Sequence, residues 1–305
     1  MKKVLVATEK PFAPTAVNQI KEIIEKAGHE LILLEKYKEK DELIKAALMA
    51  NAMIVRSDIV TKEILEACSS LELVVRAGAG FDNIDFKTAA ENNIVVMNTP
   101  GQNSNAVAEL VFGLMIYHAR KCFNGAIGTE IRGKTIGIHA YGNIGKLVGK
   151  IAKGFGMKVF AFDPFIPAEI IEKDRITPVI KVEELYKNCQ YISLQIPSSA
   201  ETKKSINYSL LSLMPKDAVL VNTARKDIIN EPDILKMMTE RSDFSYLSDF
   251  EPDNKSDLEK FSGRLLITAK KMGAQTEEAN INAGIAAANQ IVSYFATGDV
   301  RFKVN

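Results

Sequence analysis

Short apolar runs alternate with helical patterns along the whole chain. The run KVLVAT at 3–8 is followed by AVNQIKEIIEKAG, whose apolar residues recur at helical spacing and which ends at Gly28. The runs LILLE, AMIVR, LELVVRAG and IVVMN continue the alternation, with helical patterns among them. Repeated strand–helix–strand patterns predict parallel sheets wrapped by helices, which is an α/β fold.

The alternation restarts after a long helical stretch at 104–120. Its strands, such as KTIGIHAY and DAVLVNTA, are apolar on both faces, as buried parallel strands are. We therefore predict two Rossmann-like, doubly wound parallel-sheet domains, 1–103 and 104–275, with a final helix in 276–305 that returns to the first domain. A cleft between two such domains is a natural ligand site, so we expect the active site there.

Composition narrows the class of protein. A chain of 305 residues can bury two cores, and its net charge of +1 gives no long-range attraction to nucleic acid or membrane. No apolar run is long enough for a signal segment or a membrane span. The three cysteines (Cys68, Cys122 and Cys189) are odd in number and scattered, which favours reduced thiols in a cytoplasmic protein and argues against a disulfide frame or a metal site.

The stretch GIHAYGNIGKLVGKIAKGFGMKVFAFDP at 137–164 carries the clearest chemistry. A strand enters a glycine turn, a helix follows, and Asp163 ends the next strand 18 residues after Gly145. This is the context of the dinucleotide fingerprint, in which the phosphates lie at a helix N-terminus and the acid accepts bonds from the ribose hydroxyls. It predicts NAD rather than NADP as the cofactor, because Asp163 would repel a 2′-phosphate. The predicted cofactor residues of this stretch are Tyr141, Gly142, Asn143, Ile144, Gly145 and Asp163.

Ala140 stands where the fingerprint has its first glycine. An alanine is tolerated there if its φ is negative. His139, inside the strand, is interpreted as a packing residue.

Several motifs in a fixed order resemble the D-2-hydroxyacid dehydrogenases: VVRAGAGFDNID, NTPGQNSNAVAEL, the nucleotide loop, LVNTAR and SDFEP. The resemblance covers nearly the whole chain. Within that family it is greatest to the phosphoglycerate dehydrogenase branch, in a short form that lacks C-terminal regulatory domains. It implies an NAD-dependent oxidoreductase that moves hydride between C2 of a 2-hydroxy acid and nicotinamide.

The resemblance also implies roles for individual residues. Arg225 would grip the substrate carboxylate and the C2 oxygen, and Glu251 would orient the acid/base group. Asp249 would contact the nicotinamide carboxamide. Other cofactor contacts implied by the family pattern are Pro197, Thr223 and Ala224.

Lysine replaces the catalytic histidine of the family. Where relatives have a Pro-His pair after the strand LLITA, this chain has Lys270 and Lys271. Counting from the strand favours Lys270, and counting back from TEEA favours Lys271, so both stay candidates, with Lys270 preferred. Because an amine in water loses its proton near pH ~10.4 and an imidazole near ~6.5, we expect an alkaline optimum for oxidation.

The substrate's far end is predicted from two arginines that each follow an apolar strand. Arg56 and Arg76 would lie at the carboxyl edge of one sheet and bind a doubly charged group, and phosphate is the obvious one. Ser57 is assigned to the same site. The N–H groups of Ala77, Gly78 and Ala79 are expected to converge on the substrate carboxylate.

Four departures from the family pattern affect this prediction. Gln195 stands where relatives often have histidine, and Lys226 follows Arg225 where glycine is usual. The interval from Asp249 to Glu251 is short. The linker at 120–133 is short as well, so we expect a homodimer built on the nucleotide-domain helices rather than a tetramer.

The leading function is oxidation of a phosphorylated 2-hydroxy acid. A glyoxylate or hydroxypyruvate reductase, or another D-2-hydroxyacid dehydrogenase, stays open, because these enzymes share every motif except the need for a phosphate site. A non-enzymatic NAD(H) sensor of the corepressor type also shares the fold.

Overall fold

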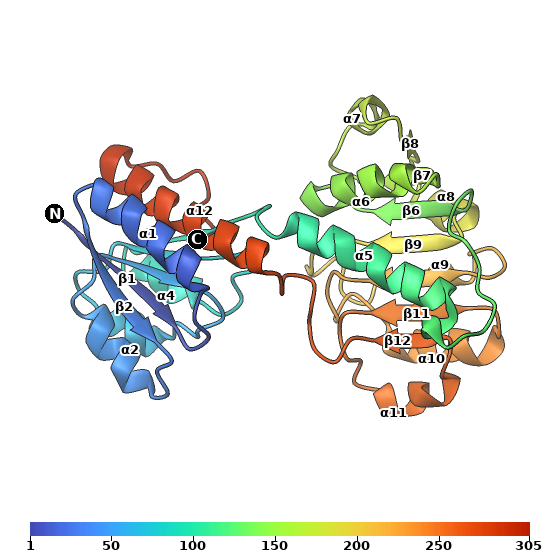
Figure 1. Cartoon of the computed structure of the whole chain (residues 1–305), viewed down its shortest axis with the longest axis horizontal. Helices are drawn as coiled ribbons and strands as arrows, with labels where there is room; N and C mark the ends of the chain where they lie inside the picture. The colour runs from blue at the N-terminus through green and yellow to red at the C-terminus, as the bar shows by residue number, and fades with distance from the viewer. The chain divides into compact units, whose positions relative to one another are not determined.

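The computed structural model describes all residues, Met1–Asn305, and the chain divides into two compact units (Figure 1). The first unit joins Met1–Asn103 to Gln275–Asn305, and the second is Ser104–Ala274. Both are parallel α/β layers, as predicted from the alternation of apolar runs.

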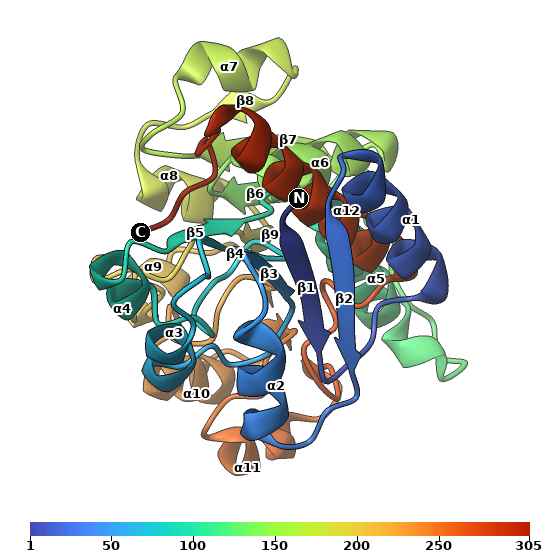
Figure 2. The ribbon, with the colours of Figure 1, turned by 90° about the vertical axis from the view of Figure 1, so that its left-hand side faces the viewer.

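The first unit has a five-stranded parallel sheet in the order β2-β1-β3-β4-β5. Helices α1 and α12 cover one face, and α2, α3 and α4 cover the other (Figure 2). Its elements are β1 (Lys3–Thr8), α1 (Pro14–Lys26), β2 (Glu30–Glu35), α2 (Lys40–Ala47), β3 (Ala52–Val55), α3 (Lys62–Ala67), β4 (Leu73–Arg76), α4 (Phe86–Glu91), β5 (Val95–Asn98) and α12 (Glu277–Thr297).

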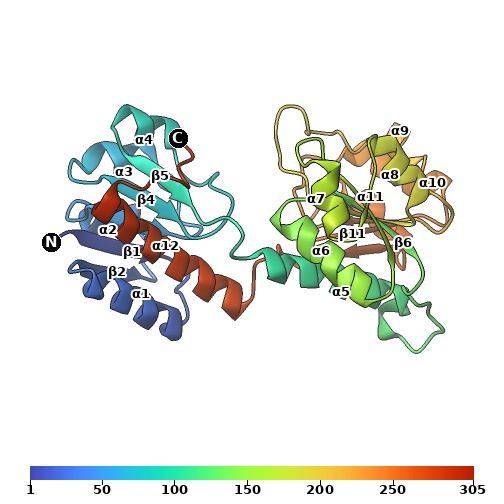
Figure 3. The same cartoon turned by 90° about the horizontal axis from the view of Figure 1, so that it is seen from above.

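The alternation of side chains along β1 explains the two cores of this unit. Val4 and Val6 pack under α1 and α12, whereas Leu5 and Ala7 face α2 and α3. Helix α12 lies alongside α1 although it comes from the other end of the chain (Figure 3). Thr276 caps it by accepting a hydrogen bond from the N–H of Ala279, 3.1 Å away.

The second unit has a seven-stranded parallel sheet in the order β12-β11-β10-β9-β6-β7-β8. Its elements are α5 (Ser104–Ala119), η1 (Lys121–Phe123), β6 (Thr135–His139), α6 (Asn143–Gly154), β7 (Lys158–Phe162), α7 (Ala168–Lys173), β8 (Thr177–Pro178), α8 (Val182–Asn188), β9 (Tyr191–Leu194), α9 (Tyr208–Leu211), β10 (Val219–Asn222), α10 (Glu231–Glu240), β11 (Ser245–Ser248), α11 (Lys255–Leu258), η2 (Glu259–Phe261) and β12 (Leu265–Ile267).

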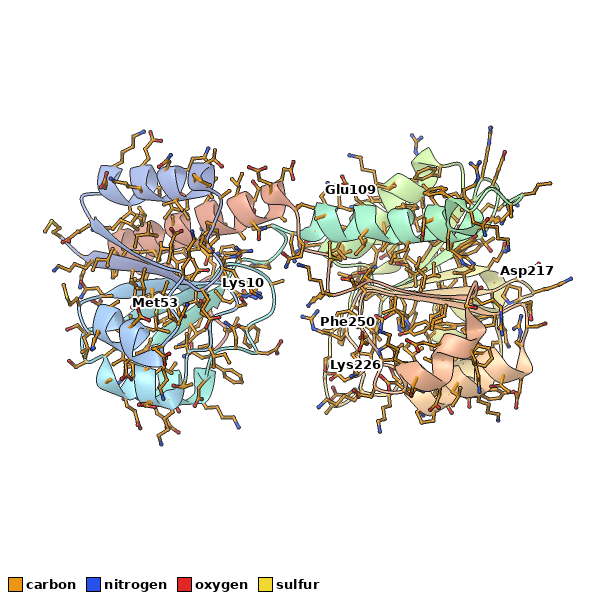
Figure 4. All side chains as sticks on the ribbon, turned by 60° about the horizontal axis from the view of Figure 1, so that its bottom comes forward. Lys10, Met53, Glu109, Asp217, Lys226 and Phe250 are labelled. Carbon is orange, nitrogen blue, oxygen red and sulfur yellow. The ribbon has the colours of Figure 1, made fainter.

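The strand order of the second sheet reverses between β6 and β9. Loops that follow these two strands leave the carboxyl edge of the sheet in opposite directions, and this reversal point is where open α/β sheets bind ligands. Lys226 and Phe250, which follow β10 and β11, lie at this end of the sheet, and Asp217 lies at the other (Figure 4). No helix of either unit is both long and apolar enough to cross a membrane.

Candidate active site

The glycine turn after β6 brings strand and helix into close contact. Helix α6 begins at Asn143 with Gly142 as its N-cap, as the fingerprint predicts. A Cβ on Gly145 would overlap the main-chain oxygen of Ala140, so only glycine permits this approach of helix to strand. Above Gly142 the space is open, which leaves room for a ligand to approach the backbone.

Ala140 adopts a φ of +83°, so the condition under which an alanine is tolerated here, a negative φ, is not met. Its N–H donates to the oxygen of Phe162 at 2.8 Å, on neighbouring β7, and this bond fixes the start of the turn. The turn therefore keeps the conformation that a glycine would adopt freely, and the alanine carries the strain.

Asp163 joins the two loops at the far end of the nucleotide site. Its Oδ2 accepts the N–H of Tyr141 at 2.8 Å, and its Oδ1 accepts those of Phe165 at 2.8 Å and Ile166 at 3.2 Å. A carboxylate has about four acceptor positions, so one is left for a ribose hydroxyl. Asp163 thus both shapes the site and stays able to bind a ligand.

The side chain of Tyr141 does not line the nucleotide site. It is fully buried, and its hydroxyl donates to Oδ2 of Asp174 at 2.7 Å. Burial, and then this bond, raise the pKa of the Tyr141 hydroxyl far above its usual range. The expectation for Tyr141 is therefore corrected to a structural role, since its main-chain N–H is also taken by Asp163. His139 packs as predicted, with Nδ1 3.2 Å from the hydroxyl of Tyr186.

The residues of this region fit a dinucleotide. The first N–H groups of α6, those of Asn143, Ile144 and Gly145, have no acceptor within the helix, and the space next to their N-cap, Gly142, is open. Beyond β9, Oε1 of Gln195 is buried without a partner, while its Nε2 donates to Ser193 and Thr223. A buried acceptor without a donor is rare, and a ligand donor at this point would satisfy it.

Two further predicted cofactor residues are held by their own chain. The oxygen of Pro197 accepts a hydrogen bond from Thr202 at 2.6 Å, and the N–H of Ala224 donates to Oδ1 of Asn222 at 3.1 Å. Thr223 is buried beside Gln195. These contacts order the loops after β9 and β10, and the residues' roles toward a cofactor stay predictions.

In the first unit, Arg56 and Arg76 follow neighbouring strands, as predicted. Val55 of β3 pairs with Arg76 of β4, so both arginines lie at the carboxyl edge of the sheet. Nε of Arg76 donates to the oxygen of Arg56 at 3.0 Å. The guanidinium of Arg76 occupies the space that a side chain on Gly78 would need, so glycine at 78 lets the cation fold over this loop.

The Arg56 guanidinium is held in place on two sides. Nη1 donates to the main-chain oxygens of Lys10 at 3.0 Å and Pro11 at 3.1 Å, and Nη2 donates to Oδ1 of Asn280. The guanidinium also lies 5.0 Å from the centre of the Phe12 ring. Burial lowers the pKa of Arg56, and the charge of Asp58 opposes this. Of five N–H donors, three are used, so two stay available to an anion. Ser57, beside it, is exposed.

The predicted anion loop is only partly available. The N–H of Ala77 donates to the oxygen of Val55 at 2.8 Å, and that of Gly78 donates to the oxygen of Arg76 at 2.9 Å. These two groups are therefore not free to bind a carboxylate, because the strand ladder and a tight bend already use them. The N–H of Ala79 has no acceptor, and the prediction stands for that group alone.

Arg225 is positioned by Asn222, which the sequence reasoning missed. The buried Asn222 side chain receives the N–H of Ala224 and donates to the oxygen of Arg225 at 2.8 Å. Nη1 of Arg225 donates to the oxygen of Ala224 at 2.8 Å, and the side chain is half-buried. The sequence does mark Asn222, because it is the last residue of an apolar strand and stands directly before the TAR motif.

The two lysines and the two nearby acids have different surroundings. Lys270 and Lys271 are exposed, and Nζ of Lys271 lies 5.1 Å from the centre of the Phe250 ring. Glu251 forms an ion pair with Lys255 at 2.9 Å rather than with either lysine of the loop. Asp249 is fully buried and bonded to its own chain, so its predicted contact with the nicotinamide is not open in this structure.

The fold and this arrangement of residues define an NAD-linked oxidoreductase, and comparison with known proteins gives the family. A family model described as "D-isomer specific 2-hydroxyacid dehydrogenase, NAD binding domain" matches residues 114–266. The chain belongs to the D-isomer specific 2-hydroxyacid dehydrogenases, and its second unit contains their NAD-binding domain.

Individual relatives differ in their named substrates. The chain is 35% identical to D-3-phosphoglycerate dehydrogenase of Methanocaldococcus jannaschii over 83% of its own length and 51% of the relative's. It is 34% identical to hydroxypyruvate reductase of Thermotoga maritima over 86% of its length and 90% of the relative's. It thus spans about half the length of the phosphoglycerate dehydrogenase from M. jannaschii.

A solved structure covers the whole chain. The NAD⁺-bound 3-phosphoglycerate dehydrogenase of Entamoeba histolytica is 48% identical, with a TM-score of 0.90, over 100% of this chain and 98% of that one. NAD is accordingly the cofactor of this chain, as the sequence predicted.

Proposed function

We propose that the chain catalyses the NAD-dependent oxidation of 3-phospho-D-glycerate to 3-phosphohydroxypyruvate, the first step of phosphorylated serine biosynthesis. The observation that carries the substrate is the pair Arg56 and Arg76 at adjacent strand ends. Two guanidinium groups at one edge match the charge of a phosphate group better than that of a plain hydroxy acid. The names of the similar proteins from M. jannaschii and E. histolytica agree with this choice.

The two arginines are prepared for an anion. Arg56 keeps two N–H donors after bonding to Lys10, Pro11 and Asn280, and these contacts hold its planar group still. Less side-chain freedom is then lost when a phosphate binds. Because burial disfavours the charge of Arg56, an anion at this point also stabilises the site.

At the reacting end, the second unit supplies the groups for C2. Arg225 would bind the carboxylate and the C2 oxygen, with its loop held by Asn222. Lys270 or Lys271 would take the hydroxyl proton during oxidation and return it during reduction. When bound, NAD supplies the hydride acceptor. Lys270 is favoured over Lys271 because its ammonium has no partner, whereas Lys271 lies over Phe250.

The test compares 3-phosphoglycerate with D-glycerate, which lacks the phosphate. Arg56→Ala should lower kcat/KM for 3-phosphoglycerate by about 10- to 100-fold, the worth of a charge-assisted bond, and leave D-glycerate within about twofold. Arg301→Ala is the control, because Arg301 is an exposed arginine of the same unit paired with Asp299. Equal losses on both substrates would show that Arg56 is not a phosphate ligand.

A hydroxypyruvate reductase is the second candidate, favoured by the similarity to the T. maritima protein. A reductase function predicts that the wild-type protein prefers the unphosphorylated keto acid and that Arg56→Ala does not change this preference. A non-enzymatic NAD(H) sensor predicts no turnover on either substrate.

We also propose a cytoplasmic homodimer. Phe123 and Ile127, in the linker after α5, have 67% and 96% of their surface exposed, which is unusual for large apolar side chains. A second copy packed on the helices of this unit would cover them. Sedimentation of the wild type and of Ile127→Asp tests the dimer, and a monomeric wild type would contradict it.

A further inference from the structure

Asp58, in the loop after β3, is a buried carboxylate that joins three strand ends of the first unit. The residue is only 3% exposed. Its Oδ1 accepts the N–H of Glu9, after β1, at 2.7 Å and the hydroxyl of Tyr37, after β2, at 2.9 Å. Its Oδ2 accepts the N–H of Arg56 at 3.0 Å. A carboxylate is tolerated at this depth only when donors satisfy it, and here each donor follows a different strand.

The loop after β1 also receives the guanidinium of Arg56. Nη1 of Arg56 donates to the main-chain oxygens of Lys10 and Pro11, which directly follow Glu9 in the chain. Oδ1 of Asp58 therefore holds the loop that carries these acceptors, while its Oδ2 holds the main chain of the arginine itself. One carboxylate thus fixes both ends of the Arg56 side chain.

The main-chain oxygen of Arg56 links this network to the second arginine. It accepts a hydrogen bond from Nε of Arg76, at the end of neighbouring β4, at 3.0 Å. Nδ2 of Asn83 donates to the main-chain oxygens of Asp58 at 2.7 Å and Arg56 at 3.3 Å, so the turn at 56–58 is bonded from a further side. A shift of the Arg56 backbone would consequently move both cations.

Tyr37 supplies the side-chain donor of the network. It is buried in the core on the α2 side of the sheet. Burial, and then the charge of Asp58, raise the pKa of the Tyr37 hydroxyl above its usual range, so the hydroxyl keeps its proton and stays a donor. Because one hydroxyl and two main-chain N–H groups all bond to the carboxylate of Asp58, its orientation is fixed.

We propose that Asp58 is a positioning residue for the phosphate site, whose carboxylate fixes the loops after β1 and β3 so that Arg56 and Arg76 meet the phosphate in one prepared geometry. This rests on the proposed function, in which the two arginines bind the phosphate. Positioning and charge act in opposite directions here. A carboxylate near a bound phosphate repels it, whereas a carboxylate that orders two arginines favours its binding. The sign of the effect of removing the charge therefore decides between the two.

Asp58→Asn is the direct test, because it removes the charge and keeps the shape. An amide has one acceptor oxygen, so in either orientation its NH₂ group faces a main-chain N–H, that of Glu9 or that of Arg56. We expect KM for 3-phosphoglycerate to rise about 10-fold and kcat to stay within about twofold. For D-glycerate, which lacks the phosphate, kcat/KM should also stay within about twofold. A lower KM for 3-phosphoglycerate would mean that repulsion outweighs positioning, and would overturn the proposal.

Hydrogen exchange reports on the two loops themselves. In Asp58→Asn, the amides of 8–12 and 56–58 should exchange at least tenfold faster than in the wild type. Tyr37→Phe removes one donor of three and serves if Asp58→Asn does not fold. It should raise KM for 3-phosphoglycerate by about threefold and leave D-glycerate unaffected. A KM equal to that of the wild type in Tyr37→Phe would then overturn the proposal.

Asp85→Asn is the matched control for the change of charge. Asp85 is a half-buried N-cap of α4 in the same unit, and it accepts the N–H of Thr88 at 3.1 Å and the Thr88 hydroxyl at 2.8 Å. The substitution removes the same charge but leaves the bonds of Asp58 in place. KM for 3-phosphoglycerate should therefore stay within about twofold. A rise as large as that in Asp58→Asn would assign the effect to general loss of charge or stability and overturn the proposal.

A double-mutant cycle shows whether Asp58 acts through Arg56. In the Arg56→Ala background, Asp58→Asn should change kcat/KM for 3-phosphoglycerate by less than about threefold, because little remains to be positioned. Independent, multiplicative losses would overturn the proposal.

Failure of this proposal can be told apart from failure of the proposed function. Equal losses on 3-phosphoglycerate and D-glycerate in Arg56→Ala would overturn the phosphate assignment, and the role of Asp58 with it. A loss confined to 3-phosphoglycerate in Arg56→Ala, together with an unchanged KM in Asp58→Asn, would overturn the role of Asp58 alone.

Discussion

Glu251 and Lys255 form an ion pair 2.9 Å long, in which Lys255 is the first residue of α11 and Glu251 lies in the loop before it. The side chain of Glu251 is 62% exposed, so solvent screens this ion pair and the pair does not hold the carboxylate firmly. We therefore expect that Glu251 can turn toward the lysine loop when substrate binds.

The first prediction compares Glu251 with a second acidic residue that also lies near Lys255. Glu259 lies 4.0 Å from Lys255, with the same exposure as Glu251, but four residues on the other side of it. Glu251→Gln should lower kcat on the order of 10-fold through loss of the acid/base orientation, with KM little changed. Glu259→Gln should be within about twofold of wild type in a steady-state assay. Similar losses in the two variants would assign both acids to the stability of α11.

The second prediction concerns coenzyme choice. Asp163 accepts three main-chain N–H groups, and we expect its remaining acceptor position to bind the ribose. Asp163→Ala should weaken NADH binding by about 10- to 100-fold and weaken NADPH binding less, because the repulsion of a 2′-phosphate is removed as well. Fluorescence titration with both coenzymes measures this.

Tyr141→Phe is the control for that experiment. It keeps the main-chain bond to Asp163 and removes only the hydroxyl bond to Asp174, so both coenzymes should bind about as in wild type. If Asp163→Ala weakens NADH and NADPH by the same factor, Asp163 acts only by shaping the loops.

How much could be predicted from the sequence depended on the range of the interactions involved. The two sheets and the nucleotide turn follow from local periodicity and from glycine at 142 and 145, so they were predictable. The hydrogen bond that the Ala77 N–H donates was not predictable, because its acceptor is the main-chain oxygen of Val55, on the neighbouring strand. The ion pair of Glu251 depends on α11, which has only four residues and leaves no periodic pattern.

The third prediction tests the strain in the nucleotide turn. Since Ala140 has a φ of +83°, glycine should relieve it and a β-branched residue should increase it. Urea unfolding should therefore rank the stability Ala140→Gly, wild type, Ala140→Val, from high to low. The gain from glycine is about 1 kcal/mol at most, because a more flexible unfolded chain offsets part of it. If glycine is the less stable residue by more than this, the alanine side chain contributes packing that outweighs the strain.

The fourth prediction is a pH dependence of stability that originates at His139. Burial lowers the pKa of His139 from 6.5 to about 4, against a smaller opposing effect of Asp163. Above pH 6.5 the residue is neutral in both the folded and the unfolded chain and gives no slope. As the pH falls from 6.5 to 4, the unfolded chain takes up a proton that the folded chain does not, so stability is lost over this window, by roughly 3 kcal/mol in total.

His139→Asn should remove this slope. The variant is expected to be less stable than wild type at pH 8, since the contact with Tyr186 is altered, but its further loss between pH 6.5 and 4 should be smaller by roughly 3 kcal/mol. Burial also lowers the pKa of His118 to about 4, and this contribution is the same in both proteins and cancels in the comparison. Urea unfolding at pH 8, 6.5, 5.5 and 4.5 measures the difference as it develops. Parallel stability curves for the two proteins would mean that His139 takes up its proton in the folded chain as easily as in the unfolded one.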